Sequence, residues 1–307
     1  MENRNRNQYS SQAKVHNIKD LLDINISRAR RFLAGITIVQ RIYFKFKFDI
    51  LRNLFGFLFT HRYLYDETHF SNSFLALNPV CNNYTAKKKV PEQVFCFWTG
   101  DNEMSPARRK ALDGLIRNAK LEAVLITPGN LKQFILEEFP LHPGYYYLSL
   151  VHKSDYLRCY FMHHYGGGYS DIKSATSSWQ KPLELLNNND DKWIIGFREF
   201  GLRGVAPVNG EIGKILKEYW YVLLGTNAYI CKPKSPFTSE WYKELNNRMD
   251  YFFDQLQANP GNILGDNPGY PIPWTGILGQ IFHPLCLKYH KRLLYSDKLR
   301  PVIKGHR

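Results

Sequence analysis

The segment 153–173 constrains the fold of this chain more than any other part of the sequence. Leu157 and Phe161 are four residues apart, which is the spacing of side chains on one face of a helix. Three glycines at residues 166 to 168 then predict the end of that helix, because glycine adopts the left-handed backbone of a helix C-cap without a Cβ clash. The residues that follow are typical of a short strand, and this strand delivers one carboxylate, Asp171, to its end.

A charged pair lies on the predicted helix just before the glycines. Asp155 and Arg158 are three residues apart, so they share a face and can point at one ligand. As an exposed ion pair with no function they would contribute only about 0.2–0.5 kcal/mol. Together with a carboxylate beyond the glycine turn, however, the pair favours a site for a charged, sugar-bearing nucleotide.

The two motifs S-D-x-x-R at residues 154–158 and Y-G-G-G-Y-x-D at residues 165–171 stand in this order. The segment resembles the sugar-nucleotide core of retaining GT-A glycosyltransferases. These include capsular-polysaccharide and mannosyltransferase-like enzymes and the glucosylating domains of large clostridial toxins. Looser similarity extends from Pro91 to Pro284. The resemblance implies a GT-A type nucleotide-binding fold, which is an α/β fold with a mixed, mainly parallel central sheet.

The resemblance also implies roles for individual residues. Asp155 would accept hydrogen bonds from sugar or ribose hydroxyls, and Arg158 would hold the sugar or phosphate of the donor. The implied catalytic residues are Asp155, Arg158, Asp171 and Lys173. The implied donor-binding residues are Trp98, Thr99, Gly100, Asp155, Arg158, Gly167, Gly168, Tyr169, Asp171 and Trp274.

The chain departs from the family pattern at Lys173, where a second aspartate of a D-x-D motif is expected. In the resembling enzymes the two aspartates hold Mn²⁺ or Mg²⁺, which prefer oxygen ligands, against the donor's diphosphate. A protonated lysine cannot be such a ligand. The sequence therefore leaves three alternatives: Asp171 holds the metal alone, the ammonium of Lys173 neutralises the diphosphate, or Lys173 only pairs with Asp171.

Strands and helices alternate on both sides of this segment, which predicts an open, mainly parallel sheet. Before it we expect strands at 94–98 and 121–126 and helices at 105–118 and 131–139. After it we expect strands at 193–197 and 227–231, a helix at 238–256 and a long irregular loop at 257–275. Ligands bind beyond the carboxyl ends of such strands, where Trp98 and Asp171 should lie. Trp98 either stacks on the nucleotide base, a contact of about 1–3 kcal/mol, or is a core tryptophan.

The net charge of +14 is concentrated at the N-terminus, where residues 1–62 carry eight Arg and four Lys against three Asp and one Glu. We expect a disordered tail at 1–16, a basic helical region with a connector at 17–90, and a glycosyltransferase domain at 91–307. Residues 18–59 mix basic and apolar side chains. They form either an amphipathic segment on an anionic membrane surface or a helical subdomain that packs on the domain behind it.

The expected reaction is transfer of a sugar from a UDP- or GDP-linked donor to an acceptor hydroxyl on a glycan or glycolipid. The resemblance places such a reaction in the synthesis of capsule, lipopolysaccharide or another surface polysaccharide. The alternative is a catalytically inactive GT-A domain that binds sugar nucleotide or glycan. Nucleic acid is not an expected partner, since no recognised module accompanies the charge. Five scattered cysteines and the lack of a signal-peptide pattern favour a cytoplasmic protein, with peripheral membrane contact through residues 18–59 as an option.

Overall fold

The computed structural model describes residues 63–81, 84 and 89–302. The predicted tail at 1–16, the basic segment at 18–59 and most of the region 17–90 lie outside the described residues. Within the described part, no helix is both long enough and apolar enough to cross a membrane.

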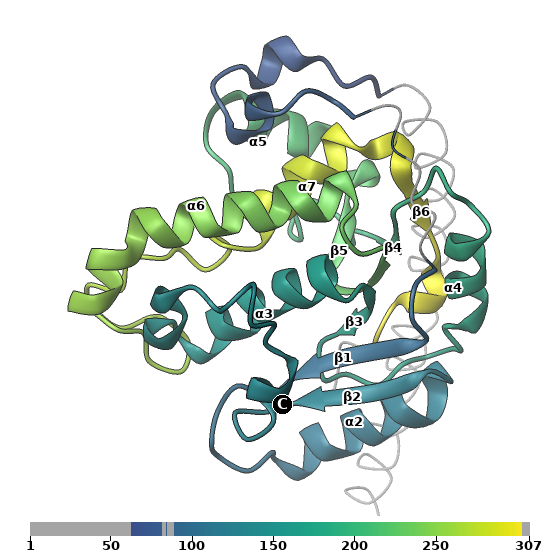
Figure 1. Ribbon diagram of the computed structural model, residues 1–307. Coiled ribbons are helices and arrows are strands. Elements are labelled where there is room, and N and C mark those ends of the chain that lie inside the picture. The colour runs from purple at the N-terminus through teal and green to yellow at the C-terminus, as the bar shows by residue number, and fades with distance from the viewer. Residues whose placement is uncertain (1–62, 82–83, 85–88, 303–307) are drawn as a thin grey trace, which may run out of the picture. The chain divides into compact units, whose positions relative to one another are not determined.

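A six-stranded sheet with the order β2-β1-β3-β5-β4-β6 forms the centre of the fold (Figure 1). Strand β5 runs antiparallel to both of its neighbours, and the other neighbouring pairs are parallel. The strands are β1 (Gln93–Phe97), β2 (Glu122–Ile126), β3 (Gly167–Ser170), β4 (Ile194–Arg198), β5 (Leu224–Cys231) and β6 (Leu293–Tyr295). The predicted α/β architecture with a mixed, mainly parallel sheet is confirmed.

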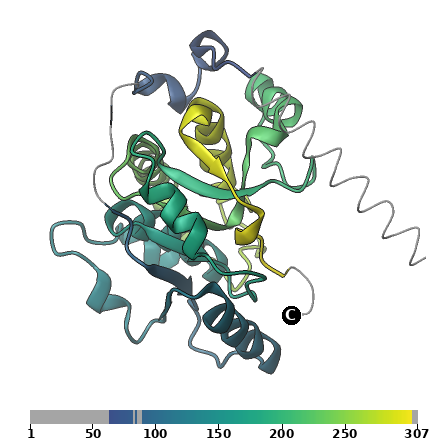
Figure 2. The same ribbon diagram turned by 90° about the vertical axis from the view of Figure 1, so that its right-hand side faces the viewer.

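Helices cover both faces of this sheet, because its strands are apolar on both faces. On β1, Phe95 and Phe97 belong to one buried cluster, and Val94 and Cys96 belong to a second cluster on the opposite face. Helices α3, α6 and α7 pack on the first face, and α2 and α4 pack on the second (Figures 1 and 2). The helices are α2 (Pro106–Ala119), α3 (Leu150–His164), α4 (Gln180–Asn187), α5 (Gly210–Glu218), α6 (Pro236–Ala258) and α7 (Gly279–Lys288).

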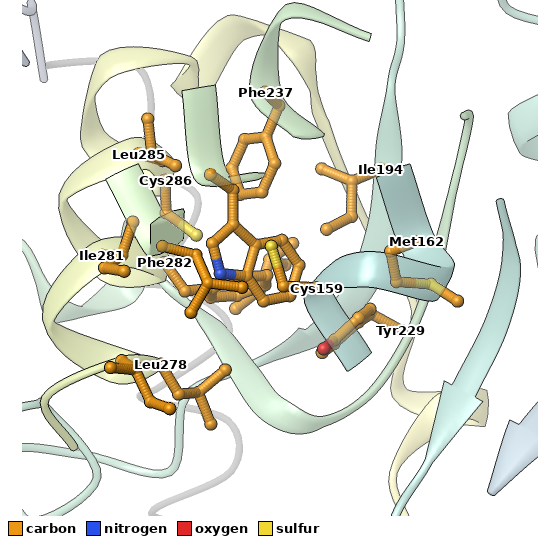
Figure 3. Close-up of a cluster of buried hydrophobic side chains, with 14 of the residues drawn as sticks. Cys159, Met162, Ile194, Tyr229, Phe237, Leu278, Ile281, Phe282, Leu285 and Cys286 are labelled. Atoms are coloured by element: carbon orange, nitrogen blue, oxygen red, sulfur yellow. The ribbon is translucent and has the colours of Figure 1, made fainter. Parts of the chain in front are cut away.

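The larger buried cluster fixes α3 against α6, α7 and the sheet (Figure 3). Phe237 of α6 and Phe282 of α7 pack edge to face, with ring centroids 5.3 Å apart. Cys159 and Met162 bring α3 into the same cluster, and both are fully buried. Burial of each such large apolar side chain contributes about 1.5–3 kcal/mol, so the position of α3 is determined by the core and not by its polar face.

The helix–glycine–strand segment is as predicted. Helix α3 begins after Ser149, whose Oγ accepts a hydrogen bond from the backbone N–H of His152. It ends at His164, and Gly166 and Gly167 follow with φ values of 70° and 88°. Strand β3 then pairs with β1 and β5 and ends one residue before Asp171.

The predicted helix at 131–139 is wrong, since only the 3₁₀ turn Leu131–Phe134 forms there. The hydroxyl of Tyr160 accepts from the backbone N–H of Leu136 and donates to the carbonyl of Phe139. These bonds satisfy backbone groups that a helix would otherwise satisfy internally, and they hold the segment in an irregular conformation on α3.

Candidate functional site

Three residues mark one edge of the sheet, where the parallel strands have their carboxyl ends. Trp98 directly follows β1, Thr127 directly follows β2 and Asp171 directly follows β3. The hydroxyl of Thr99 donates to the carbonyl oxygen of Leu150 at 2.7 Å, and this bond joins the loop after β1 to the first turn of α3. The predicted position of Trp98 and Asp171 at this edge therefore agrees with the strand directions.

Four charged side chains form a continuous cluster at the end of β3. The Nη2 atom of Arg158 lies 3.0 Å from Oδ1 of Asp155 and 3.6 Å from Oδ1 of Asp171. The Nζ atom of Lys173 lies 2.7 Å from Oδ2 of Asp171. The side chain of Asp155 is 4% exposed and that of Asp171 is 26% exposed, so Asp171 is at the open end of the cluster. We name these four residues the charged cluster.

The two carboxylates of the charged cluster differ in their electrostatics. Burial raises the pKa of Asp155, and the guanidinium of Arg158 offsets only part of that effect. Burial also acts to raise the pKa of Asp171, but Arg158 and then Lys173 outweigh it and hold this pKa below its ordinary value. Asp171 is therefore an ionised carboxylate at neutral pH, and its charge is matched by two cations.

Tyr169 and Thr226 fix the orientation of these groups. The hydroxyl of Tyr169 donates to Oδ1 of Asp171 at 2.6 Å, and the guanidinium carbon of Arg158 lies 4.4 Å from the centre of the Tyr169 ring. The Nη1 atom of Arg158 donates to the carbonyl oxygen of Thr226 at 2.9 Å. Thr226 was not predicted, because nothing in its own sequence surroundings marks it. It reaches the site only through the antiparallel pairing of β5 with β3.

Arg108 and Asn227 are further residues of this edge that sequence reasoning did not place here. Arg108, in the first turn of α2, donates from Nη1 to the carbonyl oxygen of Ile172 at 3.1 Å. The carbonyl oxygen of Asn227 accepts from the backbone N–H of Asp171 at 2.9 Å. The Oδ1 atom of Asn227 is buried without a hydrogen-bond partner in the described part of the chain. The predicted start of α2 at Ser105 was the one available signal for Arg108.

A cavity of about 380 Å³ lies at the carboxyl ends of β1 and β2. Its lining includes Trp98, Gly100, Leu112, Leu125, Thr127 and Gly129. The indole Nε1 of Trp98 donates to the carbonyl oxygen of Asn102 at 2.7 Å, so the ring is held as part of the wall. Trp98 and Gly100 of the predicted donor-binding set thus share one concave, partly apolar surface, which suits a flat ring with polar edges.

The long irregular loop after α6 is anchored on the first turn of α3. The backbone N–H of Leu150 donates to the carbonyl oxygen of Asn262 at 3.3 Å. The carbonyl oxygen of Trp274 lies 3.3 Å from Nε2 of His152, and the hydroxyl of Tyr270 lies 2.9 Å from Nδ1 of the same ring. Burial lowers the pKa of His152, which makes it a packed, neutral residue that ties the loop to α3. The side chain of Trp274 is mostly exposed, so this predicted site residue lies on the surface beside α3.

Gly167 and Gly168 are not brought to the charged cluster. Both are buried inside β3, and a Cβ at Gly168 would lie 3.1 Å from side-chain atoms of Trp179 and Val94. At about 3.3 Å per strand residue, Gly168 is about 10 Å from Asp171 along the chain. Close packing between the strands explains why glycines occur at these two positions, and no ligand is needed to explain them.

A larger cavity of about 750 Å³ lies elsewhere. Lys192, two residues before β4, and Arg292, directly before β6, line this cavity. The cavity is therefore at the amino ends of these strands, on the opposite edge of the sheet from Asp171. In doubly wound α/β folds the carboxyl edge is the ligand-binding edge, so the smaller cavity, which lies at that edge, is the better candidate.

The charged cluster does not fit the divalent cation that the sequence resemblance implies. Oδ1 of Asp171 is engaged by Tyr169 and Arg158, and Oδ2 is engaged by Lys173. A metal on Asp171 would be about 2.1 Å from an oxygen that already contacts an ammonium. Two unit charges about 4 Å apart repel by about 4 kcal/mol at an effective dielectric constant of about 20, and a divalent ion doubles this cost. Among the described residues, no group of three or more His, Cys, Asp or Glu could hold a metal ion.

No protein-family model matches this sequence, and no curated protein matches it. Among solved structures, the chain is similar to one titled "PaToxG Glycosyltransferase". The two share 12% sequence identity, with a TM-score of 0.36, and the alignment covers 77% of this chain and 78% of the other.

Proposed function

We propose that this chain is a glycosyltransferase that moves a sugar from a nucleoside diphosphate to an acceptor hydroxyl. The observation that carries the proposal is the convergence of Asp155, Arg158, Asp171 and Lys173 at the carboxyl end of β3. The cavity beside Trp98 supports it, because it offers a separate place for a nucleotide base at the same edge. Asp155, Arg158 and Asp171 come from the two motifs on which the sequence resemblance rests, and Lys173 is the position where the chain departs from the family pattern.

In this proposal the charged residues act on the donor by position and charge. Asp155 and Asp171 are acceptors for the hydroxyls of the donor's sugars, and the cations neutralise the diphosphate as it leaves. By resemblance, the long loop anchored on α3 would close over the donor with Trp274 and help to exclude water. The donor is UDP- or GDP-linked and the transfer retains anomeric configuration, both by resemblance.

The proposed acceptor is a glycan or glycolipid of a surface polysaccharide such as capsule or lipopolysaccharide. Membrane contact through residues 18–59 belongs to the same proposal, since many such acceptors are lipid-linked. Equal sedimentation of the full chain and of a chain lacking 18–59 with anionic vesicles would contradict that contact.

The test of the proposed function is calorimetric binding of UDP and GDP, followed by hydrolysis of the matching sugar nucleotides. We expect one nucleotide to bind and its sugar derivatives to be hydrolysed slowly without acceptor. Asp171→Asn should reduce hydrolysis by about 10²-fold, because the donor's sugar loses an acceptor that positions it and a displacement of about 1 Å costs that much. Asp191→Asn, on the opposite edge, is the matched control and should leave hydrolysis unchanged.

Two results would change the proposal. Nucleotide binding without hydrolysis or transfer of any sugar would favour the inactive sugar-nucleotide-binding domain, for which Lys173 in place of a carboxylate is the motivating observation. Failure of both nucleotides to bind would remove the donor site altogether.

A further inference from the structure

We infer that the site holds the donor's diphosphate with cations of the protein itself, namely Lys173, Arg108 and Arg158. In this inference the site needs no divalent metal. This inference rests on the proposed function, and it concerns how the same site recognises its substrate. It starts from the mismatch between the implied metal and the charged cluster, in which Lys173 already contacts the carboxylate that a metal would use.

The charge balance of the site supports the inference. Asp155 and Asp171 are matched by Arg158 and Lys173, so the four side chains sum to zero. A carboxylate at position 173 would instead give a sum of −2, and an anionic diphosphate could approach such a site only with a metal ion. With lysine there, the site can accept an anion directly.

Within the described part of the chain, Lys173 and Arg108 have hydrogen-bond donors that remain free to bind the diphosphate. Lys173 has three N–H donors, and among the described residues Asp171 is the one acceptor for them. Arg108 uses Nη1 on the carbonyl oxygen of Ile172, the residue between Asp171 and Lys173. The guanidinium of Arg108 thus contacts the same three-residue segment that carries Asp171 and Lys173. Ammonium and guanidinium groups are the usual protein donors to phosphate oxygens.

The first experiment compares nucleotide binding by the full chain in EDTA and in Mn²⁺ or Mg²⁺. For whichever of UDP and GDP binds, we expect the dissociation constant in EDTA to stay within about twofold of the value with metal, because the cations that face the diphosphate belong to the protein. This comparison needs no variant, so it does not depend on whether a substitution folds. Binding that disappears in EDTA and returns with Mn²⁺ would overturn the inference and leave the proposed glycosyltransferase function in place.

The second experiment exchanges the cation for a carboxylate. Lys173→Asp recreates a D-x-D sequence and should weaken binding in EDTA by roughly tenfold or more, with recovery when Mn²⁺ is added. Lys173→Met should weaken binding to a similar extent without any recovery by metal. Lys181→Asp, on the exposed surface of α4, makes the same charge change away from the site and should alter neither value.

The outcomes separate the two proposals. Unchanged binding by Lys173→Met in EDTA would show that the ammonium does not contact the diphosphate and would overturn the inference. Absence of nucleotide binding by the unmodified chain, with or without metal, would instead reject the proposed function. Near-ultraviolet circular dichroism of each variant distinguishes lost binding from lost folding.

Discussion

Arg158 controls the charge balance of the site at the scale of a single residue. It lies between two carboxylates, is itself 7% exposed, and also donates to the carbonyl oxygen of Thr226. A buried ion pair contributes little net stability against an apolar replacement of both partners, but removal of one partner leaves an uncompensated charge. Arg158 is therefore expected to matter for folding as well as for donor binding.

We predict that Arg158→Met lowers the free energy of unfolding by about 3–5 kcal/mol, because Asp155 then stays buried without its cation. Urea denaturation of the variant and the unmodified chain measures this difference. Arg117→Met, on the exposed face of α2, is the control and should change stability by less than about 0.5 kcal/mol. Adding Asp155→Asn to Arg158→Met should recover part of the loss, and equal stability of the single variant and the unmodified chain would contradict the prediction.

At the scale of one element, β3 depends on glycine at its first position. Gly167 has a φ of 88°, and a Cβ there would lie 3.0 Å from the carbonyl oxygen of Gln93. That oxygen belongs to the backbone of β1, which cannot move without disturbing the centre of the sheet. The glycines that signal the end of α3 in the sequence thus also permit the close approach of β3 to β1.

We expect Gly167→Ala to destabilise the chain by about 1–3 kcal/mol, because it combines an unfavourable backbone conformation with a close backbone contact. The shift of the thermal or urea midpoint measures the effect. Gly129→Ala is the matched control, since the added Cβ would meet only Thr127 Oγ1 at an ordinary 3.7 Å. Equal midpoints for the two variants would show that β3 tolerates a side chain at this position.

At the scale of the whole molecule, buried histidines make stability depend on pH. Burial, and then the charge of Lys234, lower the pKa of His164 to about 4. Its ring is packed against Tyr160 and Tyr242, with centroid distances of 4.4 and 4.9 Å. The neighbouring His163 has its pKa lowered to about 4 by burial, by His164 and by Lys234. Both rings are therefore neutral in the folded chain at neutral pH.

We predict that the free energy of unfolding falls as the pH is lowered from 7 to 5. The folded pKa of His164 is below its unfolded value of about 6.5, so the unfolded chain binds more protons in this window. The stability due to the neutral ring is present above about pH 6.5 and is lost toward pH 4, by about 2 kcal/mol between pH 7 and 5. Urea titrations at the two pH values measure the loss. His164→Phe should reduce it, whereas the exposed His69→Gln should not. A loss of the same size in His164→Phe would assign the pH dependence to other groups.

The sequence was sufficient for those parts of the fold whose determinants are local. The helical spacing of Leu157 and Phe161 and the glycines that follow α3 act within a few residues of each other. They predicted the helix, its end and the strand that carries Asp171. The alternation of strands and helices likewise predicted the α/β class and the carboxyl edge as the place of the site. Local signals failed at 131–139, where a distant hydroxyl, that of Tyr160, competes for the backbone.

The sequence alone thus determined the four members of the charged cluster, and the tertiary structure decided what those charges contact and added Arg108 to them. Antiparallel β5 inserts between β3 and β4 and brings Thr226 to Arg158, while α2 brings Arg108 to Ile172. The sequence left the role of Lys173 open, and the fold places its ammonium 2.7 Å from Asp171. The physical reason is the distance along the chain over which each interaction acts. Helix and turn signals act over a few residues, whereas the partner of a buried charge depends on packing between elements far apart in sequence.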